Sequence, residues 1–87
     1  MKYVYPAVFG ACDEGGFSIH FPDLPGTNSQ GEDLYDALYM AELALGEWLD
    51  YLAYKNMEIP AASKIGDIKL EIDEFASLIR AEIKKSA

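Results

Sequence analysis

Hydrophobic and polar side chains alternate along the first part of the chain and predict a β-hairpin. Residues 3–11 are rich in β-branched and aromatic types, a composition typical of a strand. Residues 17–21 alternate strictly, with apolar side chains on one face and Ser18 and His20 on the other. Between these segments, Asp13-Glu14-Gly15-Gly16 is a turn signal, because glycine takes a positive φ without strain. We therefore predict two antiparallel strands joined by a short turn.

A longer period replaces the alternation in the middle of the chain. Residues 22–26 hold two prolines and a glycine and indicate an irregular loop, and residues 27–30 are a candidate short third strand. From Asp33 to about Lys55, apolar residues recur at steps of four and three. This spacing predicts one long amphipathic helix whose apolar stripe faces a sheet.

The start and the interior of this helix carry two further signals. Asp33 is a candidate N-cap, and Asp36 resembles the second member of a capping box. Gly46 lies inside the periodic pattern, where a glycine costs about 1 kcal/mol of helix stability relative to alanine. We therefore expect a close packing contact at Gly46.

Two apolar patterns follow the helix. Residues 65–72 alternate and place Ile68, Leu70 and Ile72 on one face, which predicts a fourth strand. From Glu74 onward the apolar spacing, with basic residues in the last turn, fits a short helix. The predicted order β-β-β-α-β-α indicates an α+β fold, in which one long helix crosses one face of a small sheet. Such a core is thin and does not bury all six tyrosines, so we expect a homo-oligomer or a partner protein.

Negative charge is concentrated in the first three quarters of the chain. Seven Lys and Arg stand against fifteen Asp and Glu, for a net charge of −8, and no Lys or Arg lies between Lys2 and Lys55. This balance argues against direct nucleic-acid binding, which needs basic side chains against phosphate. Two interpretations remain open: a solvated acidic face that keeps the protein soluble, or a surface complementary to a basic partner.

Length and composition exclude several classes of protein. A chain of 87 residues has room for one domain, and its single cysteine, Cys12, rules out a framework of disulfides within the chain. No apolar stretch approaches the ~20 residues that a membrane span needs. Residues 1–16 lack the features of a signal peptide. We therefore expect a cytoplasmic domain without a membrane contact.

Few residues are candidates for catalysis or metal binding. His20 is the only histidine, and a nucleophilic pair of Cys12 and His20 would lack a third group to activate the thiol. No phosphate-binding glycine motif is present, and we expect no cofactor. Asp13, Glu14 and Asp23 lie near strand ends, and their carboxylates are the oxygen ligands that Mg²⁺ prefers.

The hairpin, the loop after it and the start of the helix resemble a HicB-type antitoxin. The resemblance rests on the order and spacing of four features: the first strand, the Asp-Glu-Gly-Gly turn, the sequence FPDLPG and the helix start. The matching segments are residues 5–9, 13–26, 29–38, 48–49 and 58–63. The resemblance covers roughly residues 1–72. It implies a partial, non-catalytic ribonuclease-H-like fold of β-β-β-α-β order that oligomerises. It also implies a partner, a small basic HicA-like ribonuclease toxin with a double-stranded-RNA-binding-like fold, whose mRNA cleavage the antitoxin blocks.

On this resemblance we predict an antitoxin that occludes a basic ribonuclease toxin, and the anionic interval suits that partner. The candidate partner-binding residues are Asp13, Glu14, His20, Asp23 and Leu24. The residues expected to shape the turns are Gly15, Gly16, Pro22, Pro25 and Gly26. Two alternatives stay open. One is a Mg²⁺-dependent nuclease that uses Asp13, Glu14 and Asp23 on a ribonuclease-H-like core, and the other is a scaffold domain that only self-associates.

The end of the chain departs from the pattern of that family. Many members carry a C-terminal ribbon-helix-helix or helix-turn-helix module, and residues 73–87 are too few for either. We expect residues 1–72 to form the partner-binding domain. We expect residues 73–87 to form a short C-terminal helix with no DNA-binding domain, in either a stand-alone short member or a truncated chain.

Overall fold

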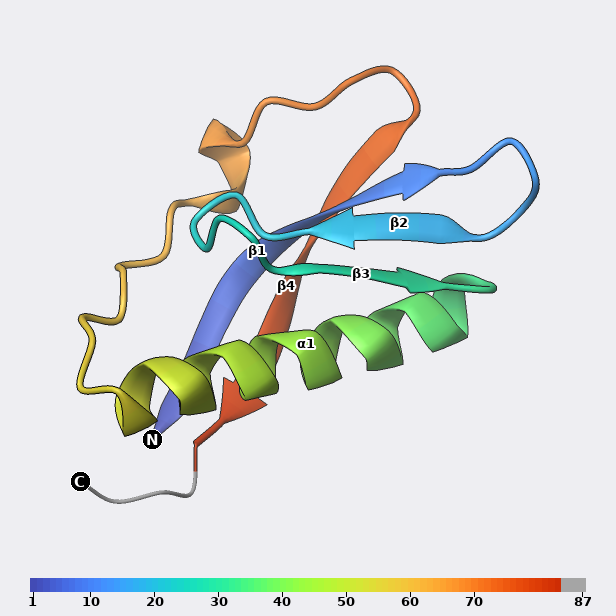
Figure 1. Cartoon of the computed structure of the whole chain (residues 1–87). Helices are drawn as coiled ribbons and strands as arrows, with labels where there is room; N and C mark the ends of the chain where they lie inside the picture. The colour runs from blue at the N-terminus through green and yellow to red at the C-terminus, as the bar shows by residue number, and fades with distance from the viewer. Residues whose placement is uncertain (84–87) are drawn as a thin grey trace.

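The fold is a four-stranded antiparallel sheet with one long helix across one face. The computed structural model describes residues 1–83. Its elements, in chain order, are β1 (Lys2–Ala11), β2 (Phe17–His20), β3 (Asn28–Gly31), α1 (Leu34–Tyr54), the 3-10 turn η1 (Ile65–Asp67) and β4 (Glu74–Glu82) (Figure 1). The predicted α+β class is confirmed.

The strands are arranged in the order β3-β2-β1-β4, and every neighbouring pair is antiparallel. Val8 lies opposite His20 and Ala11 opposite Phe17, so the predicted hairpin is confirmed. The short third strand is also confirmed, at residues 28–31. β1 is the longest strand and the centre of the sheet, because β2 pairs with its second half and β4 pairs along nearly all of it.

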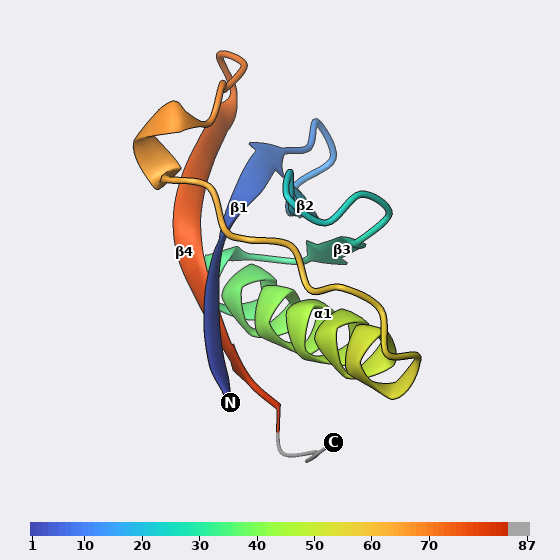
Figure 2. The same ribbon diagram turned by 90° about the vertical axis from the view of Figure 1, so that its left-hand side faces the viewer.

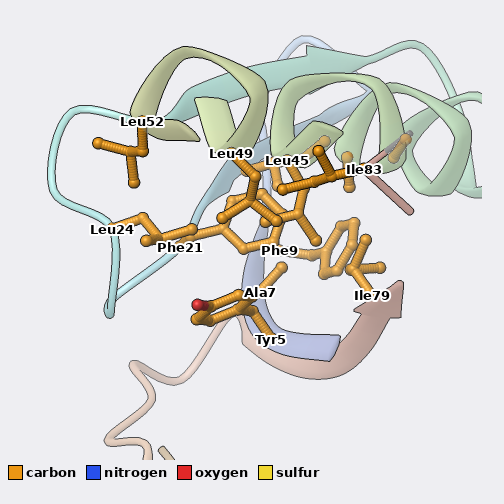
Figure 3. Close-up of a cluster of buried hydrophobic side chains, with 13 residues drawn as sticks. Tyr5, Ala7, Phe9, Phe21, Leu24, Leu45, Leu49, Leu52, Ile79 and Ile83 are labelled. Carbon is orange, nitrogen blue, oxygen red and sulfur yellow. The ribbon is translucent and has the colours of Figure 1, made fainter. Parts of the chain in front are cut away.

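The hydrophobic core lies between α1 and one face of the sheet. Figure 2 shows α1 on one side of β4 and η1 on the other. The helix buries one residue per turn, and these are Ala37, Ala41, Leu45, Leu49 and Leu52. They pack against residues of β1 and β4, of the loop after β2 and of the segment just after β4, among them Tyr5, Ala7, Phe9, Phe21, Leu24, Ile79 and Ile83 (Figure 3). The predicted amphipathic helix is therefore confirmed.

The helix start is capped as the sequence indicates. Asp33 is the N-cap, and its Oδ1 accepts a hydrogen bond of 2.8 Å from the backbone N–H of Asp36. Asp36 Oδ2 accepts 2.9 Å from the N–H of Glu32, the residue before the cap. In the usual capping box a glutamate accepts a hydrogen bond from the N–H of the N-cap residue itself. Asp36 is one methylene shorter than glutamate, and it accepts from the N–H of the residue before the N-cap instead.

The expected packing contact at Gly46 is absent, and that prediction is wrong. A Cβ built at Gly46 would have no heavy atom of another segment within 4 Å. The close approach of backbones occurs instead at Gly31, where a Cβ would lie 2.4 Å from the Cα of Ala37. β3 therefore lies directly against the first turns of α1.

The last two predicted elements are wrong. Residues 65–72 form η1 and an irregular segment rather than a strand, and Ile72 is 98% exposed. Residues 74–82 form strand β4 rather than a helix, so the sheet extends past residue 72. The long free side of β1 accounts for this outcome, because it pairs with β4 from Lys2↔Glu82 to Gly10↔Glu74. The remainder of the predicted helix, residues 84–87, lies outside the described residues.

Candidate partner-binding surface

Two shallow hollows open along the border between β3 and α1. The first is lined by the β1–β2 turn, the end of β3 and the start of α1, including Gly15, Phe17, Glu32, Asp36 and Met40. The second is lined by the loop before β3 and the second half of α1, including Thr27, Asn28, Glu47, Trp48 and Tyr51. We call this border, with both hollows, the acidic flank.

Two glycines set the shape of the first hollow. Gly16 has a φ of 82°, and a Cβ there would lie 2.6 Å from the carbonyl oxygen of Gly31. Gly31 in turn leaves no space for a Cβ against Ala37. The hairpin turn, the end of β3 and the helix start are therefore pressed together, and Gly16 and Gly31 are the residues that permit it.

The acidic flank combines carboxylates with apolar surface. Glu32 and Glu47 are exposed, and no Lys or Arg occurs anywhere from residue 3 to residue 54. The rings of Trp48 and Tyr51 stack with centroids 5.6 Å apart, and Tyr51 is 47% exposed. Aromatic side chains beside a group of negative charges are typical of a surface that binds a positively charged partner.

The opposite flank of α1 has a different charge pattern. Arg80 of β4 lies beside Glu42 of α1, with 4.0 Å between Nε and Oε2. Both side chains are solvent-exposed, so screening leaves this pair a small electrostatic contribution. This flank therefore pairs a carboxylate of α1 with a basic side chain of β4.

The predicted partner-binding residues are not brought together. Asp13 and Glu14 are exposed in the β1–β2 turn, whose neighbours Cys12 and Gly15 line the first hollow. His20 is exposed at the far end of β2, opposite Asn28 of β3. Asp13 and Glu14 therefore adjoin the first hollow of the acidic flank, and His20 lies beside a residue of the second hollow, at the other end of β2.

The loop after β2 has a structural role in this fold. Asp23 accepts hydrogen bonds from Ser63, 2.8 Å from the backbone N and 2.5 Å from Oγ. Leu24 is 1% exposed and lies in the core, so it offers no surface to a partner. Pro22, Pro25 and Gly26 shape the loop around this buried leucine, with Gly26 at a φ of 93°.

The carboxylates named for a metal-dependent nuclease are not gathered into one site. Asp13 and Glu14 precede β2, whereas Asp23 follows it, so the strand separates the carboxylates that would have to share a cation. Within residues 1–83 there is no group of three His, Cys, Asp or Glu side chains placed to hold a metal ion. β2 likewise separates Cys12 from His20, and the nucleophilic pair does not form.

A buried tyrosine anchors the segment that follows α1. The Tyr5 hydroxyl donates a hydrogen bond to the carbonyl oxygen of Pro60. Burial raises the pKa of Tyr5 above its ordinary value of 10.0, and the nearby Tyr3 and Asp23 raise it further. Tyr5 is thus a neutral hydrogen-bond donor at physiological pH, and it ties residues 56–63 to the central strand.

Glu32, Glu47, Trp48 and Tyr51 are the surface residues that the sequence analysis missed. One sequence signal points to some of them, because Met40, Ala44, Glu47 and Tyr51 follow one another at steps of three or four along α1. That spacing puts them on one side of the helix. It does not show which strand the side adjoins.

Comparison with known proteins gives consistent matches. Residues 5–85 match the family model described as HicB_like antitoxin of bacterial toxin-antitoxin system. Antitoxin HicB 1 of Photorhabdus laumondii subsp. laumondii is 31% identical over an alignment of 81 residues, and the match covers 88% of this chain and 52% of that protein. The chain spans about half the length of the curated relatives it matches, 52% and 48%.

Two solved structures have a similar fold. A toxin–antitoxin complex from Streptococcus pneumoniae contains a chain with a TM-score of 0.86 and 24% identity, and the match covers 100% of this chain and 80% of that one. A complex of HicA3 and HicB3 gives a TM-score of 0.67 and 26% identity, covering 95% of this chain and 100% of that one. None of the helices in residues 1–83 is both long and apolar enough to cross a membrane.

Proposed function

Because the chain belongs to the HicB-like antitoxin family of bacterial toxin–antitoxin systems, we propose that it is an antitoxin that binds and inhibits a small basic HicA-like toxin. Inhibition is by occlusion: the bound antitoxin covers the surface with which the toxin cleaves mRNA. The complexes of similar structures are the basis for proposing a toxin partner.

The acidic flank is the observation that carries this proposal. It has exposed carboxylates, two aromatic rings and an edge strand, β3, whose outer side pairs with no other described strand. A basic, RNA-cleaving protein presents positive charge where it meets phosphate, so a negative surface of this kind competes directly with RNA. Asp13 and Glu14, which adjoin the first hollow, are proposed contacts of the same surface.

The remaining predicted contacts have different places in this proposal. His20 lies on the exposed sheet face beyond the flank, where it is a peripheral contact at most. Asp23 and Leu24 act indirectly, because they fix the loop that leads into Thr27 and Asn28 of the second hollow.

We further propose that the domain is non-enzymatic and acts in the cytoplasm, where its toxin encounters mRNA. The succession of three antiparallel strands and a covering helix supports a partial ribonuclease-H-like lineage. The separation of Asp13 from Asp23 supports a lineage without metal-dependent catalysis. The net charge of −8 supports binding of a protein rather than direct binding of DNA.

The test is purification of the chain from its source cells, with mass spectrometry of the proteins that elute as salt rises. We expect a small basic protein in equal amount, which cleaves mRNA when separated and is inhibited when this chain is added back at a one-to-one ratio. Elution of this chain without such a protein, or a captured protein whose RNA cleavage is unaffected, would contradict the proposal.

Charge-matched variants then locate the surface. Glu32→Gln with Glu47→Gln removes two charges from the acidic flank, and Glu58→Gln with Glu71→Gln removes two exposed charges elsewhere. We expect the first pair to weaken toxin binding about 10-fold and to flatten its salt dependence, and the second pair to have little effect. Equal effects of the two pairs would show that only net charge matters.

A further inference from the structure

The second hollow of the acidic flank places two aromatic rings beside a carboxylate. Glu47 and Trp48 lie four and three residues before Tyr51 on α1, so the three side chains share one side of the helix and line the hollow together. The rings of Trp48 and Tyr51 stack with centroids 5.6 Å apart, and Glu47 is exposed. Such a combination favours a bound cation, because the face of an aromatic ring and the negative carboxylate both attract positive charge.

The groove on the other flank of α1 contains a similar combination together with its cation. Tyr39 and Glu42 of α1 and Arg80 of β4 line this groove, and the Nε of Arg80 lies 4.0 Å from the Oε2 of Glu42. The second hollow has the carboxylate and the rings, but its described lining residues include no Lys or Arg. None occurs in the sequence between Lys2 and Lys55 either. The cation that suits this hollow therefore does not come from the elements that form it.

The missing cation identifies what the second hollow binds. We propose that it receives an arginine side chain of the partner protein, whose guanidinium lies over the indole of Trp48 and donates hydrogen bonds to the carboxylate of Glu47. This inference deepens the proposed function and rests on it, because the partner proposed there is a small basic protein. The partner's arginine then has the same role on this flank that Arg80 has beside Glu42 on the other.

Two features of the hollow favour arginine over lysine. A guanidinium is planar, so it stacks on an aromatic ring while its edge donates to a carboxylate, whereas an ammonium is a compact point charge. The second feature is Thr27, which lines the hollow, is 5% exposed and has a hydroxyl oxygen without a hydrogen-bond partner in the described residues. A buried oxygen without a partner is unfavourable. A guanidinium has five N–H donors and an ammonium three, so arginine has more donors left for acceptors beside Glu47.

Trp48 is the only tryptophan of the chain, so its signals report on this hollow directly. The probe is the blocked tripeptide acetyl-Gly-Arg-Gly-amide, which is titrated into the unmodified chain while NMR follows the indole N–H of Trp48. The same tripeptide with lysine has the same charge, and the version with citrulline has nearly the same shape without the charge. We expect a saturable shift with arginine, about 5-fold weaker binding with lysine and no saturable shift with citrulline.

Matched variants on the two flanks of α1 locate the bound peptide. Glu47→Gln with Tyr51→Leu removes the carboxylate and one ring of the hollow and keeps Trp48 as the reporter. Glu42→Gln with Tyr39→Leu makes the same changes on the other flank. Tyr51 and Tyr39 are 47% and 55% exposed, so neither substitution removes a core side chain. We expect the first pair to weaken binding of the arginine peptide about 10-fold and the second pair by less than about 2-fold.

The basic protein captured with the chain provides the second measurement. Glu47→Gln with Tyr51→Leu should weaken its complex about 30-fold, and the pair on the other flank should weaken it by less than about 2-fold.

Three results would each overturn the inference: no saturable shift of the Trp48 signal with the arginine peptide, equal binding of the arginine, lysine and citrulline peptides, or equal effects of the two pairs on the complex. If the captured protein is still inhibited in such a case, the proposed function stands without this inference. An arginine-specific shift of Trp48 in a chain that captures no basic protein would contradict the proposed function, while the preference of the hollow for arginine would hold.

Discussion

The carboxylate of Asp23 accepts two hydrogen bonds from Ser63, although forty residues of chain separate the two. One comes from the backbone N–H at 2.8 Å and the other from the hydroxyl at 2.5 Å. They join the loop after β2 to the segment after α1, beside the position where the Tyr5 hydroxyl meets Pro60. A residue that the sequence suggests as a binding group thus holds two distant parts of the fold together.

Replacement of Asp23 by alanine should lower the free energy of unfolding by about 1–1.5 kcal/mol, because it removes the charged acceptor of two hydrogen bonds that join distant segments. Urea denaturation measures the change. Asp13→Ala is the control, since Asp13 lies exposed in a turn and surface substitutions stay within about 0.5 kcal/mol. Equal losses in the two variants would argue against a structural role for the Asp23–Ser63 contact.

Two glycine substitutions should change stability in opposite directions. Gly31→Ala should destabilise by about 1–3 kcal/mol, because its Cβ would lie 2.4 Å from the Cα of Ala37. Gly46→Ala should stabilise by about 0.5–1 kcal/mol, because alanine is the better helix former and the site has space for a Cβ. Thermal unfolding of both variants provides the comparison. A stable Gly31→Ala variant would mean that β3 and α1 separate easily.

Tyr5 should make stability depend on pH in the alkaline range. Burial raises its pKa in the folded state, so the neutral phenol favours folding. Its contribution is complete below the unfolded value of 10.0 and is lost as pH rises through the higher folded value. At pH 7, Tyr5→Phe should lower the free energy of unfolding by about 1 kcal/mol, because phenylalanine cannot make the hydrogen bond to Pro60.

The dependence of stability on alkaline pH distinguishes ionisation of Tyr5 from a simple loss of packing. Denaturation at pH 7 and above pH 10 should show a smaller alkaline decrease in Tyr5→Phe than in the unmodified chain. Tyr35→Phe is the matched control, because Tyr35 is 86% exposed. A decrease of the same size in all three proteins would assign the alkaline loss to other groups.

Loss of the N-cap should loosen the start of α1. Asp33→Ala removes the acceptor for the N–H of Asp36 and should cost about 1 kcal/mol of stability, whereas Asp33→Ser should cost less because serine also caps. Hydrogen exchange at residues 34–37 should accelerate in the alanine variant. Unchanged exchange there would show that packing against β3 alone fixes the helix start.

The hairpin and α1 were predictable from sequence because their signals are local. The alternation of Phe17, Ile19 and Phe21 and the cap at Asp33 each lie within a few residues of the structure they specify. Residues 74–83 were not predictable in the same way. Their apolar positions satisfy helical spacing, and the same segment also alternates toward the core through Ile79 and Ile83. The free side of β1 decides between the two, and it lies more than sixty residues away in sequence.

Some features of the candidate site were likewise predictable from the sequence and others were not. The concentration of negative charge and the exposure of Asp13 and Glu14 follow from the sequence alone. Three other features depend on contacts between distant segments. They are the position of Asp23 beyond β2, the burial of Leu24, and the hollow that Glu47 lines together with the loop before β3. Such contacts are not encoded in the periodicity of any single element.

Pairing of β1 with β4 has a consequence for synthesis on the ribosome. The central strand emerges before the helix, and its partner strand of nine residues emerges after the hairpin and the helix are already available. Until then β1 presents an open side, and a nascent chain in that state exposes surface that can associate with other chains. Completion of the sheet therefore coincides with completion of residues 74–82, so a ribosome that stalls before them releases a chain that cannot close its fold.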